Sequence, residues 1–100
     1  MSESEDPTFD TLDLTVGRAI DEAAASIEAG EIDLALAALE RALEVSEAHP
    51  LLSKRASSEF HRVEGMARIC GRALEAANAP AVGANALIDR ARALRKSRIH

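Results

Sequence analysis

The stretch AGEIDLALAALERALEV, residues 29–45, contains the pattern that decides the fold of this chain. After Gly30, apolar residues recur at intervals of three and four, as they do on the faces of an α-helix. One side carries Leu34, Ala35, Ala38, Leu39 and Ala42, and another carries Leu36 and Leu43. Glycine readily adopts the left-handed conformation that ends many helices, so we expect Gly30 to close a preceding helix. The stretch therefore predicts a helical hairpin that turns near residue 30, with Asp33 as the cap of its second helix.

The residues before Gly30 carry the matching pattern of a first helix. Asp10 or Thr11 can cap this helix, because short polar side chains accept hydrogen bonds from its first amides. Its apolar positions are again three and four apart: Leu12, Val16, Ala19, Ile20, Ala23 and Ile27. Residues 1–8 are acidic and polar, so we expect a disordered acidic tail over 1–8 and a single helical domain over 9–100.

Two further helices are predicted after the proline at position 50. That proline ends the second helix, because the residue before a proline avoids the α conformation. From Leu52 to Ala77 an apolar stripe follows a nearly seven-residue period, which favours one long third helix of about 27 residues. Pro80 interrupts it, and residues 81–96 show the spacing of a fourth helix. The pattern leaves open whether this fourth helix is separate or a kinked continuation of the third.

These patterns predict an all-α protein. The expected architecture is a small helical bundle of three or four antiparallel helices, with the first two forming a repeat-like hairpin and with a long third helix. The chain contains 21 alanines and 2 phenylalanines, and it has no tryptophan or tyrosine. Alanine favours helices but buries little area. Because such a core is thin, a partner protein or a second copy of the chain, in a homodimer, would complete it.

Charge and cysteine content bound the setting in which the protein works. Residues 1–50 contain 13 acidic and 2 basic residues, whereas residues 51–100 contain 4 acidic and 10 basic residues. The two halves therefore attract each other, within one chain or between two chains. Cys70 is the single cysteine, which favours a reducing cytoplasm. The high alanine and low lysine content indicates a bacterial or phage genome. No run reaches the roughly 18 apolar residues of a membrane span, so no membrane contact is expected.

Residues 19–47 resemble a tetratricopeptide repeat. The matching positions are Ala23 and Ile27 in the first helix, Gly30, Glu31 and Ile32 at the turn, and Ala35, Leu39, Ala42 and Leu43 in the second helix. The departures are Ala19 at the aromatic position, Glu22 at the leucine position and Glu47 at the proline position. The resemblance implies a binding scaffold with a grooved surface and no chemistry of its own. Small bacterial proteins of this kind, including some secretion chaperones, bind helical segments of other proteins.

The sequence shows no arrangement typical of an enzyme, and we expect neither a cofactor nor a metal. The three histidines lack zinc-like spacing relative to Cys70. Two acidic pairs, Glu28 with Glu31 and Glu44 with Glu47, would suit magnesium in a metal-dependent all-α hydrolase. That hydrolase is the less favoured hypothesis, because a solvated acidic helix face explains the same residues.

The favoured function is a non-catalytic protein–protein interaction module, such as a chaperone, an adaptor or an inhibitor, whose partner the sequence does not name. Candidate partner-binding residues are Leu36, Leu43, Phe60 and Leu74, although core packing explains each of them more simply. The alternative is a regulator that contacts nucleic acid through its basic C-terminal helix. Its candidate phosphate contacts are Arg90, Arg92, Arg95 and Arg98. Nucleic acid is disfavoured because no aromatic residues are interleaved for base stacking.

Overall fold

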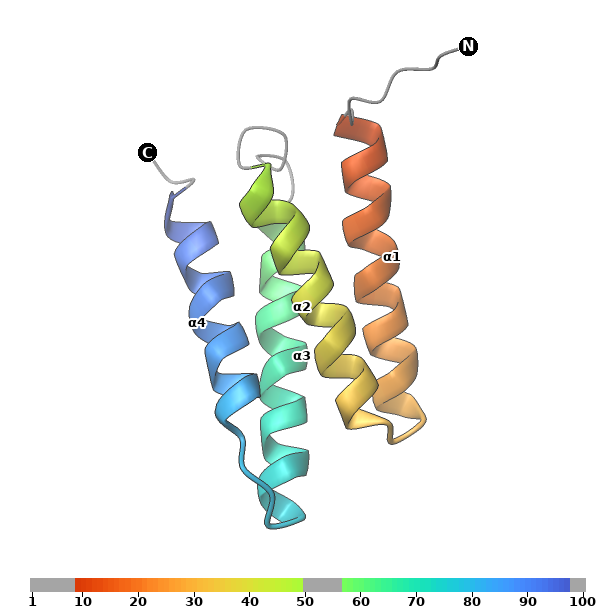
Figure 1. Cartoon of the computed structure of the whole chain (residues 1–100), viewed down its shortest axis with the longest axis vertical. Coiled ribbons are helices and arrows are strands. Elements are labelled where there is room, and N and C mark those ends of the chain that lie inside the picture. Colours follow the sequence, from red (N-terminus) through yellow and green to blue (C-terminus); the bar gives the residue numbers. More distant parts are fainter. Residues whose placement is uncertain (1–8, 50–56, 98–100) are drawn as a thin grey trace.

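A computed structural model describes residues 9–49 and 57–97, and within these ranges the chain forms four α-helices (Figure 1). They are α1 (Phe9–Glu28), α2 (Ile32–Ala48), α3 (Ser57–Ala76) and α4 (Val82–Ser97). These two ranges contain no β-strand. The predicted all-α class is therefore confirmed. The fourth helix is separate from the third and folds back along it.

The four helices form two antiparallel hairpins that lie side by side. α1 packs mainly on α2, and α3 packs mainly on α4. Between the hairpins, α3 contacts both α1 and α2, and α2 also contacts α4. α1 and α4 consequently lie on opposite sides of the molecule, with α2 in front of α3 in the view of Figure 1. The result is a flat slab that is 17 Å thick in its shortest dimension.

The first hairpin turns within three residues through a glycine in the left-handed conformation. Gly30 has a φ of 79°. Its N–H donates to the carbonyl of Ile27 over 3.0 Å, and the N–H of Glu31 donates to the carbonyl of Ser26 over 2.8 Å. This pair of bonds is the Schellman motif, which satisfies the last carbonyls of a helix. The prediction for Gly30 is confirmed. The prediction that Asp33 caps α2 is wrong: the motif returns the chain so quickly that Asp33 already lies in the first helical turn.

The second hairpin repeats this turn with asparagine in place of glycine. Asn78 has a φ of 59°, and its N–H donates to the carbonyl of Glu75 over 3.0 Å. The N–H of Ala79 donates to the carbonyl of Leu74 over 2.8 Å. Asparagine is one of the few residues with a side chain that adopt this conformation readily. Both hairpins are therefore set by one residue with positive φ.

The core lies between the two hairpins and is lined mostly by small side chains. Its buried apolar residues are Val16, Ala19, Ile20, Ala23, Ala35, Ala38, Leu39, Ala42, Leu43, Phe60, Val63, Ala67, Cys70, Ala84, Leu87, Ala91 and Leu94. They include most of the predicted stripe positions whose side chains are described. Leu34 and Ala77 are exceptions, because the spacing placed both on apolar faces and both are exposed. Ile27, Leu36, Leu74 and Ile88 are only partly buried. The close approach of α3 and α4 is visible at Gly71, where an added Cβ would lie 3.5 Å from the Cβ of Ala84.

Several expectations fall outside the described part of the chain. They are the acidic tail over residues 1–8, the proposed start of the third helix near Leu51 to Ser53, the side chain of Leu12, and Arg98. As described, α3 is 20 residues long, which is the length of α1.

Candidate binding surfaces

The four leucine and phenylalanine residues predicted to bind a partner are not equally accessible. Leu43 and Phe60 are fully buried in the core. Leu36 and Leu74 are half-buried and pack against the edge of the core or line a surface hollow. Within the described structure, only Leu36 and Leu74 of these four therefore present area that another molecule could contact.

Two grooves run along α2, one on each side of it, and they share Ala37. The groove between α1 and α2 has a volume of about 380 Å³ and includes Ala25 and Leu34. The groove between α2 and α4 has the same volume and includes Leu36 and Gly83. A hollow of about 430 Å³ adjoins them at the start of α2 and is lined by Leu34 and Leu74 among others. We call these three depressions together the α2 surface.

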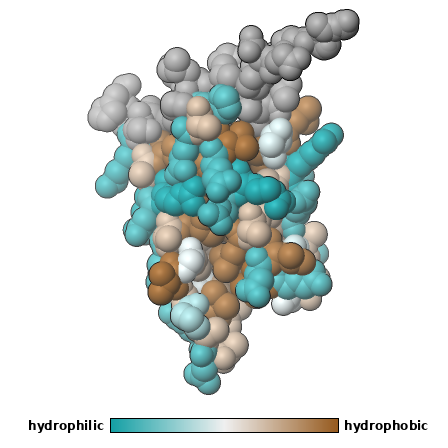
Figure 2. All heavy atoms as spheres, in the orientation of Figure 1, coloured by the Kyte–Doolittle hydropathy of each residue, from teal (hydrophilic) through white to brown (hydrophobic). Residues whose placement is uncertain are grey.

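The small residues of the sequence explain why the α2 surface is hollow. Alanine and glycine at positions 25, 37, 83 and 86 leave space between helix axes that larger side chains would fill. Figure 2 shows that apolar side chains gather on the lower half of this face and that polar side chains cover its upper half. The first half of α2 lies in that lower region. Larger exposed apolar patches are a common mark of binding sites.

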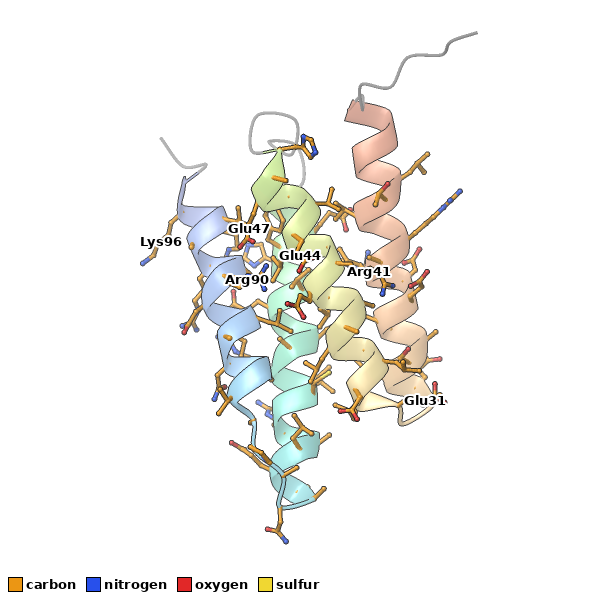
Figure 3. The ribbon with its side chains drawn as sticks, viewed as in Figure 1. Glu31, Arg41, Glu44, Glu47, Arg90 and Lys96 are labelled. Atoms are coloured by element: carbon orange, nitrogen blue, oxygen red, sulfur yellow. The ribbon has the colours of Figure 1, made fainter. Side chains whose placement is uncertain are left out.

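Acidic side chains surround the α2 surface, and its basic side chains are already paired. Glu31 and Asp33 line the hollow at the start of α2. Arg41 is paired with Glu22 of α1. Figure 3 shows Arg41 on the α1 side of α2 and Glu31 at the turn. Because the arginine is neutralised by its partner, the surface as a whole is negative.

Arg90 joins the two hairpins and faces the α2 surface. Its Nε donates to Glu47 over 3.0 Å, and a terminal nitrogen donates to the other oxygen of the same carboxylate over 2.7 Å. A second carboxylate, that of Glu40, lies 3.9 Å from the guanidinium. The hydrogen bond that Arg90 donates to Glu47 and the nearby negative charges raise the pKa of Arg90 above its ordinary value. Figure 3 shows this side chain directed from α4 toward Glu47 and Glu44 on α2.

Arg92 and Arg95 point the other way, toward α3, where they meet a buried glutamate. The side chain of Glu64 is 8% exposed. The Nε of Arg92 donates to it over 3.1 Å, Arg95 donates to its other oxygen, and a terminal nitrogen of Arg68 lies 2.6 Å away. Burial by itself would raise the pKa of Glu64. The hydrogen bond from Arg92 and the charges of Arg68, Arg95 and Arg92 outweigh burial, so the pKa lies below 4.5.

Sequence reasoning missed this cluster, which we call the Glu64 cluster, although a signal was present. Glu64 follows Phe60 by four residues and precedes Ala67 by three, so it lies next to the apolar stripe. It also lies 14 residues before Asn78, and Arg92 lies 14 residues after it. Residues equally far from the turn of a helical hairpin stand at the same level. With the turn placed at Asn78, this arithmetic brings the carboxylate and the arginine together.

The three predicted phosphate contacts that the structure describes therefore do not form one stripe. Arg90 pairs with α2, Arg92 and Arg95 pair with α3, and Arg98 lies outside the described residues. A nucleic-acid backbone is usually gripped by cations that follow it in a line. The described arginines of α4 are instead divided between two sides of the helix.

The structure also locates the residues that were considered as metal ligands or as a nucleophile. Across residues 9–49 and 57–97 no three histidine, cysteine or acidic side chains come together as a metal site would require. Glu47, one of the acids considered for magnesium, is held by Arg90. Cys70 is fully buried, and burial raises the pKa of its thiol. A buried thiol with a raised pKa reacts slowly as a nucleophile.

Comparisons with known proteins add no identity to this geometry. The chain matches no protein-family model, no curated protein and no solved structure. Among the helices described here, none combines the length and apolar character needed to cross a membrane.

Proposed function

We propose that this protein is a non-catalytic interaction module that binds a helical segment of a partner protein on the α2 surface. The observation that carries the proposal is the pair of apolar grooves on either side of α2, joined through Ala37 and ending at the exposed Leu34. Grooves lined by small and apolar residues accept the apolar side chains of an amphipathic helix. Chaperones, adaptors and inhibitors all work in this way without chemistry of their own.

Electrostatics specify the partner further. Residues 9–49 contain 10 acidic and 2 basic residues, and acids such as Glu31 and Asp33 line the α2 surface. A helix with basic residues beside its apolar face would be attracted, whereas an acidic helix would be repelled. The partner is therefore a basic amphipathic helix. A cytoplasmic location belongs to the same proposal, because the single cysteine, Cys70, is buried and unpaired with another cysteine.

A repeat-like scaffold is also part of this proposal. Two features support it: the partial resemblance of residues 19–47 to a tetratricopeptide repeat, and the way the hairpins stack. Each inner helix touches both helices of the other hairpin, as α3 does with α1 and α2. Stacked helical hairpins of this kind form extended surfaces for binding peptides and helices.

Two exposed leucines offer a matched test. Leu34 on the α2 surface is 57% exposed, and Leu14 on α1, which lines none of the three depressions, is 59% exposed. The full chain, immobilised, should capture a basic partner from a lysate of its native host. Leu34→Glu should weaken the binding of that purified partner at least about tenfold, because a charge in an apolar contact is strongly unfavourable. Leu14→Glu, with the same chemical change, should leave binding unchanged.

The same pair of variants shows how the proposal would fail. Equal binding by wild type and Leu34→Glu, with both chains folded by circular dichroism, would contradict a site on the α2 surface. Sedimentation tests whether a second copy of the chain occupies the α2 surface. A dimer that is lost in Leu34→Glu and kept in Leu14→Glu would show that the surface binds a second copy of the chain instead of a different protein.

A further inference from the structure

The Glu64 cluster lies beside a surface hollow of about 280 Å³ between α3 and α4. The hollow is lined by Glu64, Arg92, Arg95 and Lys96. Arg68 contacts the same carboxylate from one turn further along α3. Glu64 is buried at the base, whereas Arg92 and Lys96 are exposed. Figure 3 shows Lys96 on the outer edge of α4, on the side away from α2. The hollow is therefore distinct from the α2 surface.

Positive charge exceeds negative charge in this hollow. Three cationic side chains, those of Arg92, Arg95 and Lys96, line the hollow together with one carboxylate. Among the described residues, Glu64 is the acid with which Arg68, Arg92 and Arg95 pair. Each guanidinium has five N–H donors, whereas a carboxylate accepts about four hydrogen bonds. Most of the donors are therefore not used by Glu64 and remain for water or for another anion.

Neutralisation of the buried acid does not account for this excess. Elsewhere in the same molecule a single arginine is enough for one carboxylate, because Arg90 binds both oxygens of Glu47. Three arginines held close together repel one another, and the repulsion is relieved when a second anion binds between them. Glu64 fixes the positions of Arg92 and Arg95, so the ordering cost of binding an anion is already met in part.

We infer that the hollow beside Glu64 binds one phosphate group, with Arg92, Arg95 and Lys96 as its donors and Glu64 as the residue that positions the two arginines. Tetrahedral phosphate matches the planar donor pairs of arginine. A single group is expected, not a nucleic-acid strand, because the next arginine, Arg90, faces α2 and is paired with Glu47. The site is independent of the protein-binding function proposed above.

The test uses inorganic phosphate and the full chain, followed by amide chemical shifts in nuclear magnetic resonance. Millimolar phosphate should shift the amides near Glu64 and from Arg92 to Lys96 in a saturable way, and sodium chloride at the same ionic strength should not. Lys96→Gln should weaken phosphate binding by about threefold, as expected for one exposed charge contact. The double variant Arg92→Gln, Lys96→Gln should abolish saturation. Arg18→Gln on α1 removes one positive charge, as Lys96→Gln does, and serves as its control. It should bind phosphate as the wild type does.

Three results would overturn the phosphate site. The first is an equal response to chloride, which would show general screening. The second is unchanged phosphate affinity in Lys96→Gln and in the double variant. In the described structure no ion pair or hydrogen bond joins exposed Lys96 to Glu64, so Lys96→Gln should remain folded and give a clear answer. The third is tight binding of an oligonucleotide without a terminal phosphate through both Arg90 and Arg92, which would favour a nucleic-acid interface.

Discussion

The α1–α2 hairpin and the α3–α4 hairpin reverse the chain with the same backbone hydrogen bonds, yet their charges are opposite. Residues 9–49 carry 10 acidic and 2 basic side chains, whereas residues 57–97 carry 4 acidic and 7 basic side chains. The first hairpin contributes most of the apolar α2 surface. The second holds a buried carboxylate between arginines. Backbone geometry thus makes the two hairpins alike, and side-chain chemistry gives each its own surface.

The two hairpins also fill the core differently. The largest buried side chains of the first are Ile20, Leu39 and Leu43, which are similar in size. In the second, Phe60 is the single aromatic ring of the described core and is 0% exposed, whereas the leucines Leu87 and Leu94 are 4% and 9% exposed. The second hairpin should therefore depend most on Phe60, and the first should depend on several side chains of similar size.

The largest expected effect is the loss of that aromatic ring. Phe60→Ala should lower the free energy of unfolding by about 3–5 kcal/mol, because it removes the buried ring and leaves a cavity. Native domains are stable by only about 5–15 kcal/mol, so this variant should be close to unfolding. Urea denaturation followed by circular dichroism measures the change. Phe60→Leu, which keeps most of the volume, should cost less than about 1.5 kcal/mol.

Leu39→Ala is the corresponding variant in the first hairpin and should lower the free energy of unfolding by about 2–5 kcal/mol. A loss of under about 1 kcal/mol in Phe60→Ala would mean that the second hairpin has other support. That result would remove the contrast between one dominant core residue and several equal ones.

The next effect concerns acid and tests the electrostatic contrast. The pKa of Glu64 is lower in the folded chain than its ordinary value of 4.5, so ionised Glu64 stabilises the fold. This contribution is fully present above about pH 4.5 and is lost as the pH falls through the lower folded pKa. At pH 7, Glu64→Gln should cost about 1–2 kcal/mol, a value reduced because the three arginines are partly exposed. At low pH the variant and the wild type should become equally stable.

The matched control for acid is Glu22→Gln, which removes the exposed carboxylate paired with Arg41 in the first hairpin. Its cost at pH 7 should be at most about 0.5 kcal/mol, as for other exposed ion pairs. Urea denaturation of both variants across the pH range measures the difference. If the difference in free energy of unfolding between Glu64→Gln and wild type stayed constant down to low pH, the shape of the side chain at this position would matter and its charge would not.

The contrast between the hairpins also explains how much of the molecule could be predicted from sequence. The apolar spacing predicted three or four helices and most of the core, because burial on one side of a helix is a local periodic pattern. The cap at Asp33 was wrong, because the hydrogen bonds around Gly30 decide where α2 begins. The Glu64 cluster depends on the register of α4 against α3, which follows only once Asn78 is known to be the turn.

The α2 surface was predicted only in general terms, as a groove implied by a repeat-like hairpin. Of its residues, Leu36 and Leu74 were named as partner-binding candidates, whereas Leu34 and Ala37 were not. The sequence pattern around Ala37 is the same whether this alanine packs against a neighbouring helix or lines a groove. Only the distance between the helix axes distinguishes the two arrangements. Leu34 was placed inward because its spacing fits the apolar face. It lies next to the turn of the first hairpin, where it lines a surface hollow and is 57% exposed.

The smallest expected effect is at the two turns and tests whether they are equivalent. Gly30 and Asn78 have φ values of 79° and 59°, in the left-handed region that disfavours a Cβ. Gly30→Ala should lower the free energy of unfolding by about 1 kcal/mol, because the strain exceeds the gain from a less flexible unfolded chain. Asn78→Ala should cost less, because asparagine already carries a Cβ there. Asn78→Gly should change stability by no more than about 0.5 kcal/mol, since relief of strain and greater unfolded freedom oppose each other. Thermal and urea unfolding of the three variants measure these changes. A larger loss of stability in Asn78→Ala than in Gly30→Ala would mean that the asparagine side chain itself supports the second turn. The two hairpins would then differ in their turns as well as in their charges.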